Sequence, residues 1–394
     1  MGAGGHGFIR QQEAATGGKD GGTAALTIGY HAPSPGAATG VADYAETLLN
    51  ALRGCTPADA VIERDLQRAD LQIYHLGNNR LHARIYSLAM ATPGIVVVHD
   101  AVLHHFLLGT LSRDRYIAEF VYNYGRWSRH IGEELWNERA ACAVDPRYFR
   151  YPMLRRVVEN ARAVVVHNPG AAAMIREHGG QNIQVIPHFF KSGAIPDAAD
   201  TERFRQRIGV APGVTLFGIF GYLRETKRLL PAIGAFRRLN AVRPATALLI
   251  AGDVVSGDLS RLLAGEAAHP AIHRLGHLPD ADFRTAAAAV DCCLNLRYPA
   301  AGETSGIAIR LMGIGKPVIL TDGPETAAIP ADACLRVPSG VDEGSVLFDQ
   351  MALIAEFPGL ARRIGAEGAE HIRRCHNLEN AAALYWQVIE SVQD

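Results

Sequence analysis

Solid apolar runs rich in β-branched residues alternate along this chain with longer amphipathic stretches, and this alternation restricts the fold more than any other feature. Strands that are apolar on both faces and separated by helices are typical of parallel sheets covered by helices on both sides. The sequence therefore predicts an α/β protein. We predict strands over Leu26–His31, Leu71–Leu76, Ile95–His99, Ala163–His167, Ile183–Pro187, Thr215–Phe220, Ala247–Gly252, Ile272–Leu278, Asp291–Leu296 and Pro317–Thr321.

Amphipathic patterns with helical spacing fall between these strands. A separate stretch over 101–160 is long, helical in pattern and rich in aromatic residues, and it indicates a helical insertion in the first domain. Core packing explains its aromatic residues better than a dedicated binding surface does. The other predicted helices include Val41–Arg53, Arg228–Leu239, Asp280–Ala289, Ile307–Ile314 and Asn377–Val392.

The chain has 394 residues, a length that suits two domains of ordinary size. The strands form two sets, and apolar patterning stops between them near Phe189–Asp197. We therefore predict two doubly wound, Rossmann-like domains over 26–190 and 198–376, followed by a C-terminal helix over 377–394. Residues 1–25 are rich in glycine and lack the apolar stretch of a signal peptide, so we interpret them as a disordered extension.

Composition excludes several classes of protein. The formal net charge of −1 is unlike that of proteins that grip a nucleic-acid backbone, which carry a basic excess. The longest apolar run, Ile95–Leu111, is interrupted by His99 and Asp100 and does not suit a transmembrane helix. The six cysteines form no CxxC pair and no zinc-spaced cluster. We expect no metal site, no nucleic-acid partner and a reducing, cytoplasmic compartment.

Candidate site residues follow the strands, because open parallel sheets bind ligands beyond the carboxyl ends of their strands. Two such domains place the natural site in the cleft between them. After the first strand, Gly40 and Val41 begin a helix whose free N–H groups suit an anion, although a structural turn explains them equally well. After the third strand, His99 suits hydrogen bonding to a sugar or proton exchange, although a structural histidine is the commoner case.

Two further loops carry charged residues. Arg224 and Lys227 lie in a loop that enters a helix, where two cations suit a diphosphate, although a solvated charged loop is the default interpretation. Asn78 and Asn79 follow the second strand and suit either an acceptor contact or a turn.

The segment from Glu303 to Val318 is the most informative of all. Thr304, Ser305 and Gly306 supply N–H groups at a helix start, which is a seat for phosphate. A carboxylate at Glu303 would be electrostatically costly there unless it binds something else, such as sugar hydroxyls. Gly315 suits the position just after the helix, and Pro317 stops it from continuing.

In this order and at these strand ends, the four elements resemble the GT-B-fold retaining glycosyltransferases of the large group called family 4. The likeness covers nearly everything from Leu26 onward. It implies transfer of a hexosyl group from a nucleoside-diphosphate sugar to an acceptor hydroxyl, with retention and with neither a metal nor a further cofactor. The residues that carry it are Thr39–Tyr44, His99, Arg224 with Lys227, and Glu303–Gly306 running to Gly315–Val318.

The resemblance also implies roles for these residues. Gly40 and Val41 would lie against the donor diphosphate, and His99 would contact the transferred sugar. Arg224 and Lys227 would neutralise the leaving diphosphate. In the last group, a carboxylate would bind sugar hydroxyls and backbone amides would bind phosphate. This group comprises Glu303, Thr304, Ser305, Gly306 and Ile307.

The sequence departs from the family pattern at two places. The family has a second glutamate eight positions after the first, where this chain has Leu311; aligned on the Gly-Lys-Pro-Val end, that glutamate is replaced by Arg310. In the family this glutamate grips the nucleotide ribose, so the choice of nucleotide stays open. The spacing from Arg224 to Lys227 is also short, and Tyr222 is an alternative at the usual arginine position.

These departures leave a second hypothesis, that the chain is a non-catalytic or regulatory GT-B protein that binds a nucleotide or sugar. A GT-B epimerase would need acid–base carboxylates that the sequence does not place. The acceptor also stays open among a glycan, a lipid-linked molecule and a small molecule. The resemblance further implies that the helix over Asn377–Val392 packs back on the first domain, so that the cleft closes by a hinge motion.

Overall fold

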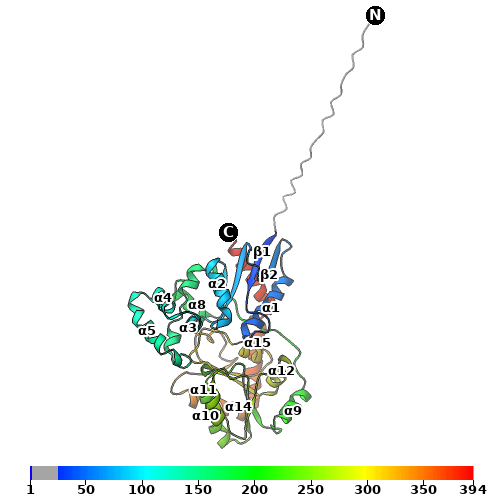
Figure 1. Ribbon diagram of the computed structural model, residues 1–394. Coiled ribbons are helices and arrows are strands. Elements are labelled where there is room, and N and C mark those ends of the chain that lie inside the picture. Colours follow the sequence, from blue (N-terminus) through cyan, green and yellow to red (C-terminus); the bar gives the residue numbers. More distant parts are fainter. Residues whose placement is uncertain (2–24, 394) are drawn as a thin grey trace.

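The computed structural model describes Met1 and residues 25–393, so the predicted N-terminal extension lies almost wholly outside the described residues, as does Asp394. Two six-stranded sheets, parallel throughout, occupy the two halves of the molecule, with helices on their faces (Figure 1). This confirms the predicted α/β architecture of two Rossmann-like units.

The first sheet has the strand order β2-β1-β3-β4-β5-β6. Its central strands are buried on both faces, which explains their uninterrupted apolar sequence. Helices α1 (Gly40–Gly54), α2 (Ala83–Ala91) and α8 (Pro169–Glu177) connect its strands. The strands are β1 (Leu26–His31), β2 (Ala60–Arg64), β3 (Leu71–Leu76), β4 (Ile95–Val98), β5 (Ala163–Val166) and β6 (Ile183–Val185).

The second sheet has the order β12-β11-β10-β7-β8-β9. The same alternation of strand and helix builds it, with β7 and β10 paired at its centre. Its strands are β7 (Thr215–Phe220), β8 (Thr246–Ala251), β9 (Ile272–Leu275), β10 (Cys292–Asn295), β11 (Val318–Thr321) and β12 (Leu335–Val337). Its helices are α9 (Ala198–Arg207), α10 (Leu229–Val242), α11 (Gly257–Glu266), α12 (Asp280–Ala289), α13 (Gly306–Gly313) and α14 (Glu343–Glu356).

The stretch between β4 and β5 is helical and projects to one side of the first sheet, where α4 and α5 lie farthest out (Figure 1). Most of its aromatic side chains pack as a core layer, with Tyr116, Phe120 and Tyr148 fully buried, whereas Trp127 is exposed. Its helices are α3 (His104–Thr110), α4 (Arg113–Tyr124), α5 (Arg129–Asn137), α6 (Arg147–Arg150) and α7 (Arg155–Asn160). Across residues 25–393, none of the helices has both the length and the apolar surface needed to span a bilayer.

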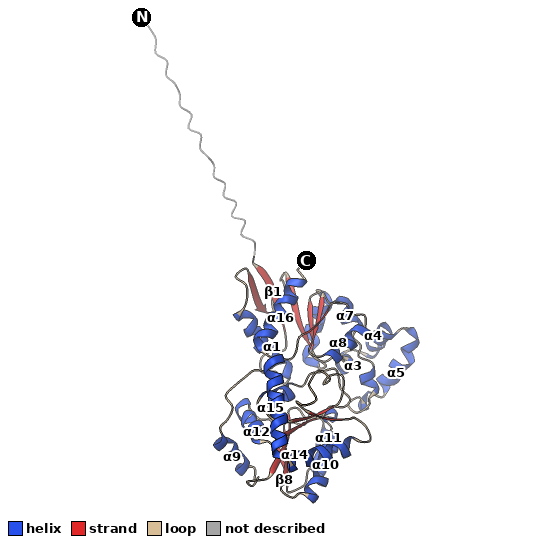
Figure 2. Ribbon diagram, turned by 180° about the vertical axis from the view of Figure 1, so that it is seen from behind, coloured by secondary structure: helices blue, strands red, loops and turns tan. Residues whose placement is uncertain are grey.

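The last two helices return the chain from the second half to the first (Figure 2). Helix α15 (Pro358–Cys375) packs on α13, and α16 (Leu378–Ser391) packs on α1. At the α1–α16 contact the hydroxyls of Tyr44 and Tyr385 lie 3.1 Å apart. The C-terminal helix is therefore part of the core beneath the first sheet.

The chain crosses between the halves near residue 188 and again near residue 376, and the two crossings bond to each other. The Phe190 N–H donates to the His376 carbonyl over 2.7 Å. The His376 ring Nδ1 lies 2.5 Å from the His188 carbonyl oxygen and must donate to it, since a carbonyl only accepts. These two bonds hold the paired crossings side by side.

Candidate functional site

The loop after β10 reaches across the cleft and touches the first domain. The Asn168 amide, at the start of α8, donates to the Gly302 carbonyl and to the Thr304 hydroxyl, both over 3.0 Å. The Val102 N–H donates to the Ala301 carbonyl over 3.1 Å. Strand ends from both sheets therefore meet around this loop, as the topology requires.

Lys227 is buried in a 3₁₀ turn that follows β7. Its ammonium donates to the Phe220 carbonyl, and the residue is 8% exposed. Burial and then the neighbouring Arg297 and Arg224 guanidinium groups lower the pKa of Lys227 to about 7. Such crowding of cations around a buried ammonium is typical of a site built for an anion.

Arg297 lies two residues after the end of β10 and belongs to the same group, although the sequence analysis did not select it. Its Nη1 lies 3.2 Å from the Glu303 carboxylate, and its buried Nε has no hydrogen-bond partner among the described residues. Its position just after a strand was the signal that could have identified it.

Glu303 is held by backbone as well as by Arg297. Its Oε2 accepts from the Ala301 N–H over 2.7 Å, and its Oε1 faces Arg297. Two residues later Ser305 caps α13 by accepting from the Ala308 N–H over 3.3 Å. The N–H groups of the first turn of α13 that Ser305 does not cap are free to complement an anion.

His99 is packed among other histidines. Its Nε2 lies 2.9 Å from the His75 Nδ1, and its Nδ1 lies 3.2 Å from the His167 Nε2. The His167 Nδ1 in turn must donate to the Ile186 carbonyl, 2.9 Å away. Burial and the neighbouring His167 hold the pKa of His99 well below its ordinary value. Both ring nitrogens are thus used by neighbours, and a sugar contact would require this chain of imidazoles to rearrange.

The loop before α1 is open, as a ligand contact would require. Thr39 caps the helix by accepting from the Val41 N–H over 3.4 Å. A Cβ placed on Gly40 would meet no atom within 4 Å. Packing in the described structure therefore does not explain why a glycine stands at position 40.

Arg310 and Asn78 are both bonded to other residues of the protein. Arg310, which stands where the family has its second glutamate, donates to Asp280 over 2.5 Å and lies 4.1 Å above the Phe283 ring. Asn78 accepts from the Phe106 N–H over 2.8 Å and so organises the start of α3. Tyr222 is half-buried in the loop after β7.

Asp100 is a second residue that the site gains from the structure. Its Oδ2 accepts from the Asn78 N–H over 2.7 Å. Burial and then Glu303 raise the pKa of Asp100 to about 6, while Arg224 and Arg297 oppose that rise. Asp100 therefore faces the site across the cleft, although it follows β4 of the first domain.

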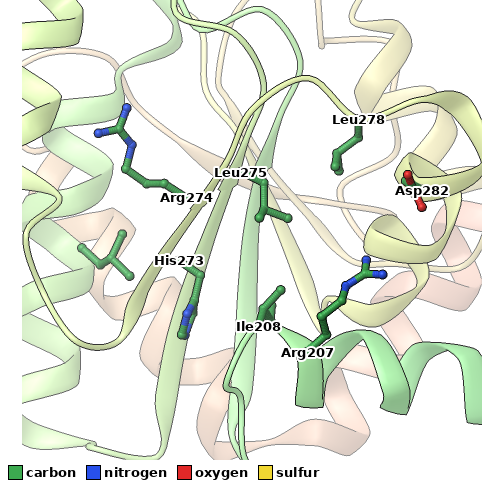
Figure 3. Close-up of a pocket in the computed structure, with 8 residues that line it drawn as sticks. Arg207, Ile208, His273, Arg274, Leu275, Leu278 and Asp282 are labelled. Carbon is green, nitrogen blue, oxygen red and sulfur yellow. The ribbon is translucent and has the colours of Figure 1, made fainter.

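A cavity of about 330 Å³ opens beside Glu303. It is lined by the loops after β10 and β11 and by Phe149 and Arg150 from the insertion. A shallower hollow of about 520 Å³ lies at the β9 edge of the second sheet, where Arg207 and Arg274 flank Leu275 (Figure 3). Within Met1 and residues 25–393, no cluster of three or more His, Cys, Asp or Glu side chains is arranged to hold a metal ion.

If a diphosphate binds at Lys227, as the sequence resemblance implies, its affinity should fall as the pH rises above about 7. The pKa of free Lys227 is about 7, and an anion binds only its protonated form well, so deprotonation weakens binding by up to tenfold per pH unit. Calorimetry between about pH 7 and pH 9, with whichever of UDP, GDP, ADP and TDP binds, would measure this, because the terminal phosphate, with a pKa near 6, is already ionised there. Affinity that stays constant over that interval would contradict a role for Lys227, and the Lys227→Met variant should show the flat profile.

No protein-family model matches the sequence, and no curated protein matches it. Several solved structures do match the chain. HepE from Anabaena, in complex with UDP and glucose, is 14% identical over 93% of this chain and 100% of its own, with a TM-score of 0.64. Sucrose-phosphate synthase from Thermosynechococcus elongatus is 15% identical over 93% of this chain and 99% of its own, also at 0.64. WaaG, a glycosyltransferase of lipopolysaccharide biosynthesis, is 13% identical over 91% and 99%, at 0.59. The chain therefore has the GT-B fold of these structures.

Proposed function

We propose that this protein is a retaining glycosyltransferase that transfers a hexosyl group from a nucleoside-diphosphate sugar to an acceptor hydroxyl without a metal. The observation that carries the proposal is the buried Lys227 ammonium, which has Arg297 and Arg224 as charged neighbours. Its Nζ and the Ile307 side chain, in the first turn of α13, both lie beside Gly221, so the three cations and the start of this helix share one neighbourhood. Among the groups of a nucleotide-sugar donor, the negatively charged diphosphate complements these three cations best.

The leaving group would be stabilised by fixed charge. As the bond between the sugar and the diphosphate breaks, negative charge grows on the phosphate oxygens. Lys227 is held by the Phe220 carbonyl and the α13 amides by their helix, so these groups need no reorganisation when that charge appears. In this scheme the side chains take the place that a bound cation has in other phosphate sites.

Glu303 would hold the transferred sugar. Its carboxylate is anchored by the Ala301 N–H and by Arg297, which leaves lone pairs for sugar hydroxyls. Asp100 approaches from the other domain, and its pKa, raised to about 6, lets it take up a proton and donate a hydrogen bond in mildly acidic solution, whereas at neutral pH it is mainly an acceptor. We propose that these two carboxyl groups enclose the sugar from opposite sides of the cleft.

Thermal denaturation with UDP, GDP, ADP and TDP should identify the nucleotide. A ligand that binds the folded state raises the midpoint, and a ligand at about a hundred times its Kd adds roughly 2.7 kcal/mol of stability. We expect one of the four diphosphates to raise the midpoint, and its nucleoside without phosphate to leave it unchanged. Failure of all four would contradict a nucleotide-sugar donor.

A second candidate is a non-catalytic GT-B protein that binds a nucleotide or a sugar. The pairing of Arg310 with Asp280 favours it, because the family's ribose-binding carboxylate is replaced by a cation that is already engaged. Slow hydrolysis of the donor in water separates the two, since an enzyme hydrolyses it and a binding protein does not.

The six cysteines are unpaired in the structure, in keeping with the cytoplasmic location that we propose.

A further inference from the structure

The cavity beside Glu303 is built from both domains. One wall is the loop after β10, a second is the loop after β11, and the third is α6 of the helical insertion. Glu303, Thr304 and Ser305 line one end, so the cavity is continuous with the donor site. Its volume of about 330 Å³ is at the small end of the range for ligand pockets.

Glu325 supplies an unpaired carboxylate to this cavity. Among residues 25–393 no other residue donates a hydrogen bond to it, and only its own backbone N–H contributes. Burial and then Glu303 raise the pKa of Glu325. Glu303 has Arg297 as a partner, whereas Glu325 has none, so the cavity presents hydrogen-bond acceptors that need donors from a ligand.

The other walls suit a carbohydrate ring. Phe149, on α6, lines the side that belongs to the first domain, and Tyr298 lines the side that belongs to the second. An aromatic face packs against the C–H groups of a sugar ring, while hydroxyls at the ring edge donate to carboxylates. An acyl chain would cover the aromatic rings but would leave the Glu325 carboxylate without a donor, which is costly.

We propose that this cavity is the acceptor subsite and that the acceptor places a sugar ring there, with hydroxyls on Glu325 and one face on Phe149; this rests on the proposed function. The acceptor oxygen bonds to the anomeric carbon of the donor sugar as the bond from that carbon to the diphosphate oxygen breaks. The electron pair leaves with the diphosphate, which also takes the hydroxyl proton.

The test compares donor and acceptor kinetics in two variants, Glu325→Gln and Phe149→Ala, with Glu367→Gln as the control because Glu367 is exposed on α15. Donors are the glucose conjugates of UDP, GDP, ADP and TDP. Acceptors are methyl glucoside, N-acetylglucosamine and 1-octanol. We expect transfer to at least one of the sugars, and an acceptor KM about tenfold higher in Glu325→Gln, which is the loss expected for one charge-assisted hydrogen bond. The donor KM should change less than twofold.

Three results would overturn the proposal. Transfer to octanol but to neither sugar would assign the cavity to a lipid, and donor hydrolysis with no sugar transfer would remove the acceptor subsite. A donor KM that rises with the acceptor KM would assign Glu325 to the transferred sugar instead. Each of these leaves the proposed function intact, whereas the proposed function fails if wild-type protein neither binds a nucleotide nor hydrolyses any donor.

Discussion

Replacing Lys227 by alanine should lower kcat/KM for sugar transfer by about 10²–10³-fold, the loss typical of removing one oriented charge from a developing anion. Lys227 has little other function in the fold. Its ammonium is buried, donates to the Phe220 carbonyl and is crowded by two guanidinium groups. Steady-state kinetics with the donor that thermal denaturation identifies would measure the loss.

Stability separates this catalytic role from a structural one. A buried ammonium among cations is destabilising, so its removal should leave the denaturation midpoint unchanged or higher. Lys227→Met keeps the volume of the side chain and should behave like the alanine variant, and Lys191→Ala, at an exposed lysine, should be silent. A lower midpoint with normal transfer would assign Lys227 to structure and contradict the mechanism.

The fold was predictable because most strands are buried on both faces. Short, uninterrupted apolar runs that alternate with helical patterns indicate buried strands of a parallel sheet. Strands β2 and β12 were not predicted, and both lie at sheet edges. Burial alternates along the first four residues of β2, which ends in Glu63 and Arg64, and β12 has only three residues. An edge position weakens the apolar signal without abolishing it, since the opposite edge strands β6 and β9 were predicted.

The end of helix α13, in the segment from Glu303 to Val318, was also predictable. Gly315 has a φ of +77°, and its N–H donates to the Met312 carbonyl, so the predicted glycine after the helix is confirmed. Pro317 follows and β11 begins at the next residue. These features depend only on neighbours in sequence, which is why pattern alone sufficed.

Features of the site that depend on neighbouring strands could not be predicted. His99 is enclosed because β3 and β5 flank β4 and bring His75 and His167 against it. Arg297 and Asp100 face the same site only because the two sheets meet at their carboxyl ends. No spacing within one segment encodes such a contact, since it arises from strand order and from the approach of two domains.

Replacing Gly302 by alanine should lower kcat for transfer by at least about tenfold while nucleotide affinity is kept. Gly302 has a φ of +74°, and a Cβ there would lie 2.6 Å from the Ala101 Cβ of the first domain. The loop would have to withdraw, breaking the bonds from Asn168 and displacing Glu303 by an ångström or so, a shift that can cost about a hundredfold in rate. Lys227 and α13 lie wholly in the second domain, so diphosphate binding should persist.

Two matched variants separate the clash from backbone strain. Gly213 has a nearly equal φ of +79°, and a Cβ there would meet no atom within 4 Å, so Gly213→Ala reports strain alone, about 1–2 kcal/mol. Asn168→Ala removes the bonds to the loop without backbone strain; it also removes the cap of α8, where Asn168 accepts from the Ala171 N–H, so its denaturation midpoint should fall as well. We expect Gly213→Ala to lower the denaturation midpoint with normal kcat, and Asn168→Ala to lower kcat in the same direction as Gly302→Ala. If Gly302→Ala kept normal kcat, the approach of this loop to the first domain would not be needed for transfer, and the active arrangement would be more open than the one described.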